Sequence, residues 1–556
     1  MVVAHTSRRA LLGLLLGLPV GCLGPTAGRT FDALPDRDAT RKRLIELGVE
    51  YERLMHQHGQ LMFQSFSGAP SQAVDPKLSA LREDEAKLFT EAERLLEYHE
   101  ALVSPREAKL WQLGALGIKL LGDPETQRLA DALRASHAEP PVVDGQPVTR
   151  AKLAELMRSP RRAERDAAFE AIQAMQRRAG PIARELLMRR NERARQLGET
   201  YYAALLRLRH VDGPRAEGLI RRLVSGTDAA MAQLAGSLER SAARSAGRRG
   251  QRAPQDLAFA LDRVLRIPDE WFPGDKAVER ALAVHRAFGF DLSRIQLVMQ
   301  EFSFAGQALA ISVPDDVRVL VRPAPGVGLY SVLLHELGHA VAASQPTQLA
   351  ALYKSYEWVA GLSEPAFDEG FAEIFGTLTG YSGVLVEHMG LDRRRAEHVA
   401  GAQRMRLMHA TRRRIAWVSF EQRALGNPKQ DLDRLARDID SRLLGALHGP
   451  SAWATNPLLA DYPVYGQSYV LASLLAFQVH AALAARAGAS QALREGQPQV
   501  NHAAGAALAQ ELLAGGMRRS ADEKLLVTTG RRLAVEPLLQ HLRRPRAAPV
   551  DPVIEL

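Results

Sequence analysis

Cysteine is nearly absent from this chain of 556 residues, and the single cysteine is Cys22. One thiol cannot form a disulfide within the chain, so burial of apolar side chains must hold the fold together. Low-complexity tracts and internal repeats of fixed period are absent as well. With 46% hydrophobic and 24% charged residues, the composition is typical of a large globular protein.

A face of strongly clustered positive charge is also lacking. The formal net charge is +9, but 63 acidic residues are interspersed with 72 Lys and Arg residues. The densest basic run, from Arg240 to Arg252, contains no aromatic residue on which a base could stack. We therefore expect a solvated loop in this run and no nucleic-acid partner.

The apolar stretch near the N-terminus, residues 10–20, is too short to span a bilayer as a mature helix. It follows Arg8 and Arg9, as in an export signal, and the paired arginines also resemble a twin-arginine signal. Cys22 follows a sequence similar to a bacterial lipobox, with Pro19 where an aliphatic residue is usual. We expect export to the periplasm, with a lipid on Cys22 as the only membrane anchor; ordinary cleavage is the alternative.

Helical periodicity dominates the rest of the chain. Apolar residues recur at i, i+3, i+4 and i+7, and Ser, Pro or Gly residues mark the starts of the helices predicted over 158–175 and 183–198. The clearest predicted helices cover residues 41–63, 83–103, 158–175, 183–198, 404–425 and 468–488. The Pro- and Gly-containing segment 139–150 is predicted to be a break between helical groups.

Residues 296–325 give the one strong β signal, with Val, Ile and Phe in partial alternation. We predict two or three short antiparallel strands there, in a mainly α fold. The predicted organisation is an export signal over residues 1–22, an N-terminal helical lobe over 30–295, a catalytic region over 296–545 and an irregular tail over 546–556.

A metal-binding pattern follows the predicted strands, in the apolar stretch YSVLLHELGHAVAA of residues 330–343. On a helix, His335 and His339 lie on one face and can direct their ring nitrogens at one point. Glu336 lies about 100° round the helix, where it can act as the general base for a zinc-activated water without binding the metal. An ordinary core helix with satisfied polar groups is the alternative.

A catalytic zinc normally has a third protein ligand, and Glu369 in FDEGFAEIFG is the candidate. Glu373 lies four residues later on the same helical face and could accept the second imidazole N–H of a ligand histidine. Asp368 and Glu364 are rival ligands, although Glu364 precedes a proline and is expected in the loop. The expected cofactor is one Zn²⁺ per chain.

HELGH followed by FDEGFAEIFG resembles the gluzincin metallopeptidases, in particular the superfamily containing angiotensin-converting enzyme, thimet oligopeptidase and oligopeptidase F. Four further stretches are similar to segments of these enzymes: DVRVLV, RRNERARQLGETYYAALLRLR, YGQSYVLASLLAFQVHAAL and LLVTTGRRLAVEPLLQHL. The resemblance covers most of the chain after the signal. It implies two helical lobes around a deep central channel, and hydrolysis of short oligopeptides.

The resemblance also implies particular site residues. The zinc ligands would be His335, His339 and Glu369, with Glu336 as the base. A tyrosine of a C-terminal helix would donate a hydrogen bond to the oxyanion; Tyr469 matches this position, and Tyr465 or Tyr462 would match it if the register slips.

The substrate-reading groups of the family are altered in this chain. Residues 451–469 contain neither the histidine usual before the catalytic tyrosine nor a lysine for a terminal carboxylate, and Ala305 replaces a second substrate-contacting histidine. Strict release of dipeptides is therefore not implied. Around Gly306 and Ala308, an extended peptide could pair with the predicted strand. The competing hypothesis is a zinc-containing lipoprotein that binds peptides without cutting them.

Overall fold

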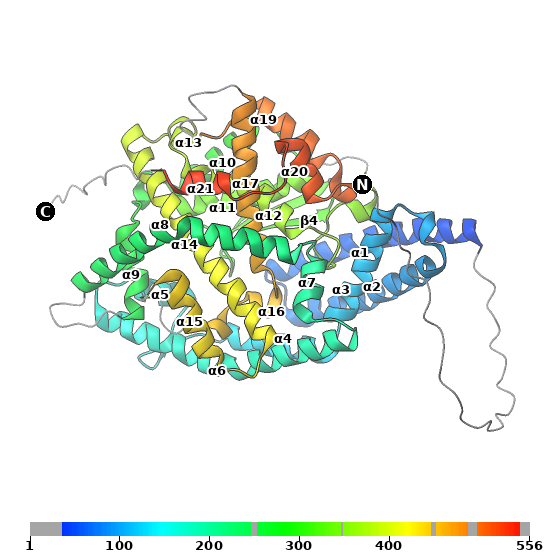
Figure 1. Cartoon of the computed structure of the whole chain (residues 1–556), viewed down its shortest axis with the longest axis horizontal. Coiled ribbons are helices and arrows are strands. Elements are labelled where there is room, and N and C mark those ends of the chain that lie inside the picture. The colour runs from blue at the N-terminus through cyan, green and yellow to red at the C-terminus, as the bar shows by residue number, and fades with distance from the viewer. Residues whose placement is uncertain are drawn as a thin grey trace, which may run out of the picture.

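A computed structural model describes residues 36–245, 253–345, 349–445, 447, 452–487 and 497–544. The predicted export signal, Cys22, the last part of the basic run and the C-terminal tail lie outside these residues. The described chain is mainly helical, as predicted, with one small three-stranded sheet (Figure 1). A channel between two lobes stays a prediction.

The first half of the described chain is built from helices of up to 35 residues. They are α1 (Arg37–Phe66), α2 (Ser71–His99), α3 (Pro105–Leu121), α4 (Pro124–Ala138), α5 (Arg150–Leu156), α6 (Arg162–Gln196), α7 (Tyr201–Leu208), α8 (Gly213–Ser245), α9 (Leu257–Val264) and α10 (Ala277–Ala287). Ser104 and Asp123 cap α3 and α4, and each is followed by a proline at the first helical position. Local sequence therefore determines where these two helices begin.

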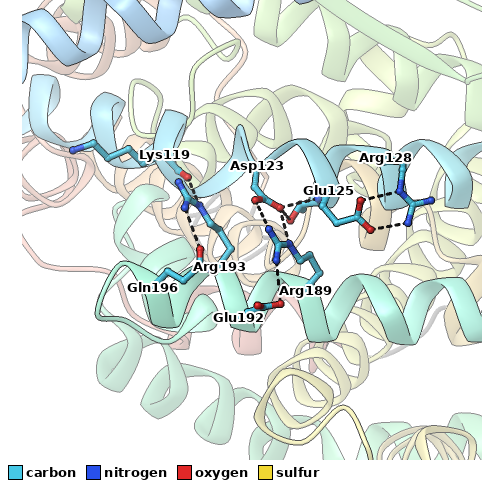
Figure 2. A network of polar contacts seen from close by, with 9 residues as sticks. Lys119, Asp123, Glu125, Arg128, Arg189, Glu192, Arg193 and Gln196 are labelled. Carbon is cyan, nitrogen blue, oxygen red and sulfur yellow. Dashed lines mark hydrogen bonds and ion pairs between the residues drawn. The ribbon is translucent and has the colours of Figure 1, made fainter.

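A polar network ties the junction of α3 and α4 to α6 (Figure 2). Arg189 holds Asp123 through a contact of 2.7 Å, and Arg193 donates to the carbonyl of Lys119 at 2.8 Å. The Arg189 guanidinium keeps the pKa of the Asp123 carboxyl well below its usual range, assisted by hydrogen bonds from Thr126. The network fixes the N-terminus of α4 against the long α6 helix.

One local prediction in this half is wrong. Helix α6 is continuous, although separate helices were predicted over 158–175 and 183–198; Pro181 lies inside it on the exposed side. Ala179 and Ala183 are buried on either side of this proline, so packing offsets the cost of a helical proline, about 3 kcal/mol. The break predicted at 139–150 is confirmed, because α4 ends at Ala138 and α5 begins at Arg150. It contains a hairpin that was not predicted, made of β1 (Val142–Val143) and β2 (Gln146–Pro147), which turns at Asp144 and Gly145 with positive φ at both.

The sheet beside the metal-binding motif contains β3 (Ile295–Met299), β4 (Gly306–Ser312) and β5 (Asp316–Val321) in the order β3-β5-β4. The predicted antiparallel arrangement is correct for β4 and β5 but wrong for β3, which runs parallel to β5. Strand β3 ends and β4 begins at the same end of the sheet, both opposite Val321, so residues 300–305 carry the chain from one side of β5 to the other. Strand β5 is thus central, and β4 lies at the edge next to α1 and α11.

The second half surrounds three adjacent helices, α11 (Val327–Ser344), α12 (Pro365–Gly376) and α17 (Gly466–Arg486) (Figure 1). Helix α17 is apolar and long enough to cross a membrane, but 78% of its apolar window is buried inside the molecule, as in a core helix. The other helices here are α13 (Ser382–Glu387), α14 (Arg393–Gly426), α15 (Leu432–Leu444), α16 (Leu458–Asp461), α19 (His502–Ala507), α20 (Ala521–Thr529) and α21 (Glu536–Leu542).

The main hydrophobic core draws on both predicted regions. It contains Leu186 and Leu223 from the first region, and Leu333, Phe371 and Leu474 from the second. The two regions therefore share one core, and the division of the chain at residues 295 and 296 stays a prediction. This shared core surrounds the helices that carry the candidate metal ligands.

The approach of α11 to α12 depends on Gly338. A Cβ atom at this position would lie 2.8 Å from the ring of Phe375 and 2.9 Å from the Cα of Ala372, closer than side chains tolerate. We expect Gly338→Ala to lower the free energy of unfolding by about 1–3 kcal/mol, measured by denaturant unfolding. Gly328→Ala, on the same helix with no atom within 4 Å of the new methyl, is the control and should not destabilise the protein. Equal losses in both variants would contradict this explanation.

Candidate metal centre

Helix α11 places the two histidines of the motif side by side. It begins after Gly326, whose φ of +80° and contact with Asp269 leave no room for a Cβ atom. Its buried apolar face packs into the core, and His335 and His339 project from the other face with 21% and 24% of their side-chain surface exposed. Their Nε2 atoms lie 3.2 Å apart. The predicted common face of the two histidines is therefore present.

Helix α12 brings Glu369 to the same point. Its Oε2 atom lies 3.4 Å from Nε2 of His335 and 3.7 Å from Nε2 of His339. The three donor atoms form the one group of His, Cys, Asp and Glu side chains in the described residues that is arranged to hold a metal ion. Glu369 is only 8% exposed, and its Oε2 accepts no well-formed hydrogen bond in the described chain.

This arrangement fits zinc. Nitrogen and oxygen ligands of a tetrahedral zinc ion lie about 2.0–2.1 Å from the metal and hence about 3.4 Å from one another. The three separations around Glu369 and the histidines bracket that value. Two imidazoles and a carboxylate are also a donor set that leaves a fourth position open, as catalytic zinc sites do.

The structure separates Glu369 from its two rivals. Asp368 accepts hydrogen bonds from the Ser355 hydroxyl at 3.2 and 3.3 Å. Glu364 directly precedes α12, as predicted from its proline neighbour, and is buried in an ion pair with Arg106. Its second oxygen accepts the backbone N–H of Ala521 at 2.6 Å. Both acids are thus used to hold the start of α12 in place.

Glu373 lies one turn beyond Glu369 and approaches His335. A Cβ atom built on Gly376 would lie 3.3 Å from Nδ1 of His335 and 3.5 Å from Oε2 of Glu373, so both side chains flank this glycine. The other oxygen of Glu373 lies 3.6 Å from the Arg414 guanidinium. A hydrogen bond between Glu373 and the second nitrogen of His335 stays a prediction, but the neighbourhood of the two side chains agrees with it.

The electrostatics of the three donors are strongly coupled. Burial alone would lower the pKa of His339, but the Glu369 carboxylate raises it to about 9. Burial would raise the pKa of Glu369, whereas the close approach of the two histidines holds that pKa well below its usual range. The cluster thus binds positive charge, which a metal cation would supply in place of protons.

Glu336 lies between the metal group and the edge strand. Burial raises its pKa, which favours a group that must accept and return a proton. The backbone N–H of Ala308 donates a hydrogen bond to its carboxylate. A Cβ atom on Gly306 would lie 2.7 Å from Cγ of Glu336, so only glycine lets the strand approach this closely.

The hydrogen bond from Ala308 to Glu336 limits how a substrate peptide could pair with strand β4. Because the Ala308 N–H is taken by Glu336, only the Ala308 carbonyl remains for pairing with a peptide. That carbonyl now accepts a hydrogen bond from the side chain of Gln307 at 3.2 Å, which a substrate N–H would have to displace. Strand addition at Gly306 and Ala308 stays a prediction.

The three candidate tyrosines form a row next to the metal group. The ring centroids of Tyr462 and Tyr465 are 5.4 Å apart, and those of Tyr465 and Tyr469 are 5.0 Å apart. The Tyr465 hydroxyl donates to Oε1 of Glu369 at 3.0 Å, so it is already engaged. The Tyr469 hydroxyl makes no hydrogen bond within the described chain, and burial together with the charge of Glu369 raises its pKa. Tyr469 therefore stays protonated and free to donate. Tyr462 shares both properties, since burial raises its pKa and its hydroxyl makes no hydrogen bond within the described residues, so Tyr465 is the one of the three that is already engaged.

Sequence reasoning missed three charged residues at this site. Arg209 lies 4.6 Å from the ring centre of Tyr465, and Arg414 lies 5.0 Å from that of Tyr469. Glu357, in the segment between α11 and α12, is close enough for its charge to act on Tyr465 and Tyr462. Arg209 ends the family-like stretch RRNERARQLGETYYAALLRLR, whereas Glu357 and Arg414 lie in no motif. All three reach the site through contacts between segments that are distant in the sequence.

No protein-family model matches the chain, and no curated protein matches it in sequence. Two solved structures share its fold. The M32 carboxypeptidase from Deinococcus radiodurans R1 is 15% identical with a TM-score of 0.61, over 91% of this chain and 98% of that one. A protein named BsuCP is 14% identical with a TM-score of 0.59, over 90% and 98% of the two chains.

The structural similarity covers most of this chain and nearly the full length of both solved structures. The narrower grouping with angiotensin-converting enzyme, thimet oligopeptidase and oligopeptidase F stays a prediction. The chain has the fold of an M32 carboxypeptidase, and this fold brings two histidines and a glutamate together as a candidate metal centre.

Proposed function

We propose that the protein is a zinc-dependent peptidase that hydrolyses short peptides. The observation that carries the proposal is the convergence of His335, His339 and Glu369, with the free Oε2 of Glu369 directed between the two imidazoles. When bound, zinc supplies a Lewis acid that polarises the peptide carbonyl and acidifies water. An ion of purely structural type would need a fourth protein ligand, and none joins this group in the described chain.

The residues around the centre have complementary tasks. Glu336 accepts a proton from the attacking water and returns it to the leaving amine, while the Ala308 N–H holds its carboxylate in place. Tyr469 donates its hydroxyl proton to the oxyanion that develops on the substrate carbonyl, an interaction often worth about 3 kcal/mol. The Arg414 guanidinium, which lies against the Tyr469 ring and near Glu373, supports this tyrosine.

Tyr465 is expected to orient the carboxylate of the metal ligand Glu369. In Tyr465→Phe, Glu369 loses the hydrogen bond that orients its carboxylate, so zinc affinity should fall about 10- to 100-fold. The measurement is a competition titration with a zinc chelator, and Tyr98→Phe, on an exposed tyrosine of α2, is the control. Unchanged zinc affinity combined with a lower kcat would instead make Tyr465 the oxyanion donor.

The proposed activity is tested by incubating zinc-loaded protein that lacks residues 1–22 with a mixed pool of short peptides. Mass spectrometry of the new termini shows whether bonds are cut and where. Removal of single C-terminal residues would agree with the carboxypeptidase activity for which the Deinococcus protein is named, and internal cuts would indicate an oligopeptidase. One zinc per chain without any cleavage would favour the non-catalytic peptide-binding alternative.

The location of this activity is part of the proposal. Arg8, Arg9 and the short apolar stretch after them support export, and Cys22 supports a lipid anchor at the outer end of that signal. The substrates would then be peptides of the cell envelope.

A further inference from the structure

One carboxylate beside the metal centre has no task in the proposed reaction. Glu357 is exposed to solvent over part of its surface and packed against protein over the rest, and the described chain offers it no hydrogen-bond or ion-pair partner. Its charge acts on His339 and on the hydroxyls of Tyr462 and Tyr465. Ser355, two residues before it, donates a hydrogen bond to Asp368, the neighbour of the ligand Glu369. Glu357 therefore lies in a segment held next to the metal ligands, within reach of the row of tyrosines.

The backbone on both sides of Glu357 is firmly anchored. Tyr356 is 1% exposed, and its hydroxyl accepts the backbone N–H of Val313 at 3.0 Å. The ring of Trp358 stacks on His58 with centroids 5.1 Å apart and an angle of 10°. His58 is itself held by the buried Glu85 at 2.9 Å. The backbone that carries Glu357 is thus held in place on both sides.

The charges that surround Glu357 are mainly negative. Desolvation by the surrounding protein and the charges of Glu369, Asp368 and Glu336 raise the pKa of Glu357 to about 7, and among the main influences only His339 opposes them. Apart from the metal centre itself, no positive group of the described chain therefore pairs with this carboxylate.

Two cations of this region, Arg209 and Lys524, are committed to other partners. Arg209 lies against the Tyr465 ring and donates to the carbonyl of Pro463 at 2.6 Å. Lys524 lies 3.6 Å from the centre of the Phe367 ring, and the charges that act on it most are those of Glu364 and Asp368. Within the described residues, neither forms an ion pair with Glu357.

We propose that Glu357 is a specificity-determining residue that binds a positively charged group of the peptide next to the bond that is cut. The inference rests on the proposed peptidase function. A protonated amine or a guanidinium would give this carboxylate its missing partner, and charge-assisted hydrogen bonds of this kind are stronger than neutral ones. The group can be the free α-amino end of a peptide or a Lys or Arg side chain, because both present the same chemistry.

The test compares matched peptides on the wild type and Glu357→Gln. One pair differs by acetylation of the N-terminus, and the other replaces Lys by norleucine. We expect the wild type to prefer one cationic member about tenfold or more in kcat/KM, and Glu357→Gln to lose most of that ratio. The pair that responds identifies the source of the charge. Glu387→Gln, at a carboxylate with 74% of its side chain exposed on α13, is the control.

Binding provides a readout that does not depend on turnover. In zinc-loaded Glu336→Gln protein, calorimetry should show the same cationic preference, and adding Glu357→Lys should reverse it in favour of acidic peptides. An unchanged preference in the Glu357 variants, with zinc content and far-UV circular dichroism intact, would overturn the inference. A wild type that cuts no peptide would refute the proposed function instead, and the binding comparison would then judge Glu357 alone.

Discussion

Glu336→Gln should lower kcat for peptide hydrolysis about a hundred- to ten-thousandfold and leave the zinc content at one ion per chain. The amide cannot accept the proton of the attacking water, and proton transfer by a positioned side chain is worth about this much. Zinc should stay because Glu336 contributes no atom to the metal group, which consists of His335, His339 and Glu369. The amide oxygen can still accept the N–H of Ala308, so the local structure should persist.

The control for this change is Glu397→Gln, at a glutamate on the surface of α14 that pairs with Arg393. It should leave both turnover and zinc content unchanged. Turnover by zinc-loaded Glu336→Gln at the wild-type rate would remove Glu336 from the mechanism. Loss of zinc in the same variant would mean that Glu336 is itself a ligand.

Replacing a ligand should have the largest effect of all. In His339→Ala, one of the three donors disappears, and the two that remain cannot hold zinc against a chelator. We expect metal content to fall from one ion per chain to a small fraction of that, and peptide turnover to fall in proportion. Metal analysis by mass spectrometry and peptide turnover, measured on the same preparation, check this result.

His56→Ala is the matched control, since His56 lies on α1 and contacts only Gln60 among the hydrogen-bonding side chains of the described residues. It should retain both zinc and activity. If His339→Ala also retained full zinc, the metal would have to be bound elsewhere, and the group formed by α11 and α12 would be an internal ion pair.

The candidate centre was largely predictable because its signal is local. His335 and His339 share a helical face through their spacing, and the neighbouring apolar residues fix that face against the core. Glu369 was predicted as the third ligand because a second glutamate, Glu373, follows it on the same face of an apolar helix. The distances between the donors, and the choice of Glu369 over Asp368, required the packing of α12 against α11.

What sequence reasoning missed depends on contacts between distant segments. The parallel pairing of β3 with β5 is set by the path of residues 300–305 and by burial of the sheet, and neither appears as a periodicity. The passage of α6 through Pro181 is likewise set by buried alanines on both sides. Arg209 reaches Tyr465 from the far half of the chain.

One missed element did have a local signal. The Asp144-Gly145 pair is typical of a tight hairpin turn, and valines precede it. The segment was predicted as a break because its prolines dominated the pattern. Its strands are two residues long, so the hairpin has little influence on the site.

The central claim is that the chain holds one zinc ion between α11 and α12. Anomalous diffraction at the zinc absorption edge, from crystals of protein without residues 1–22 grown with zinc present, tests it directly. The account predicts one strong peak within bonding distance of Nε2 of His335, Nε2 of His339 and Oε2 of Glu369. An empty centre with these three side chains paired to one another, or a peak at other residues, would contradict it.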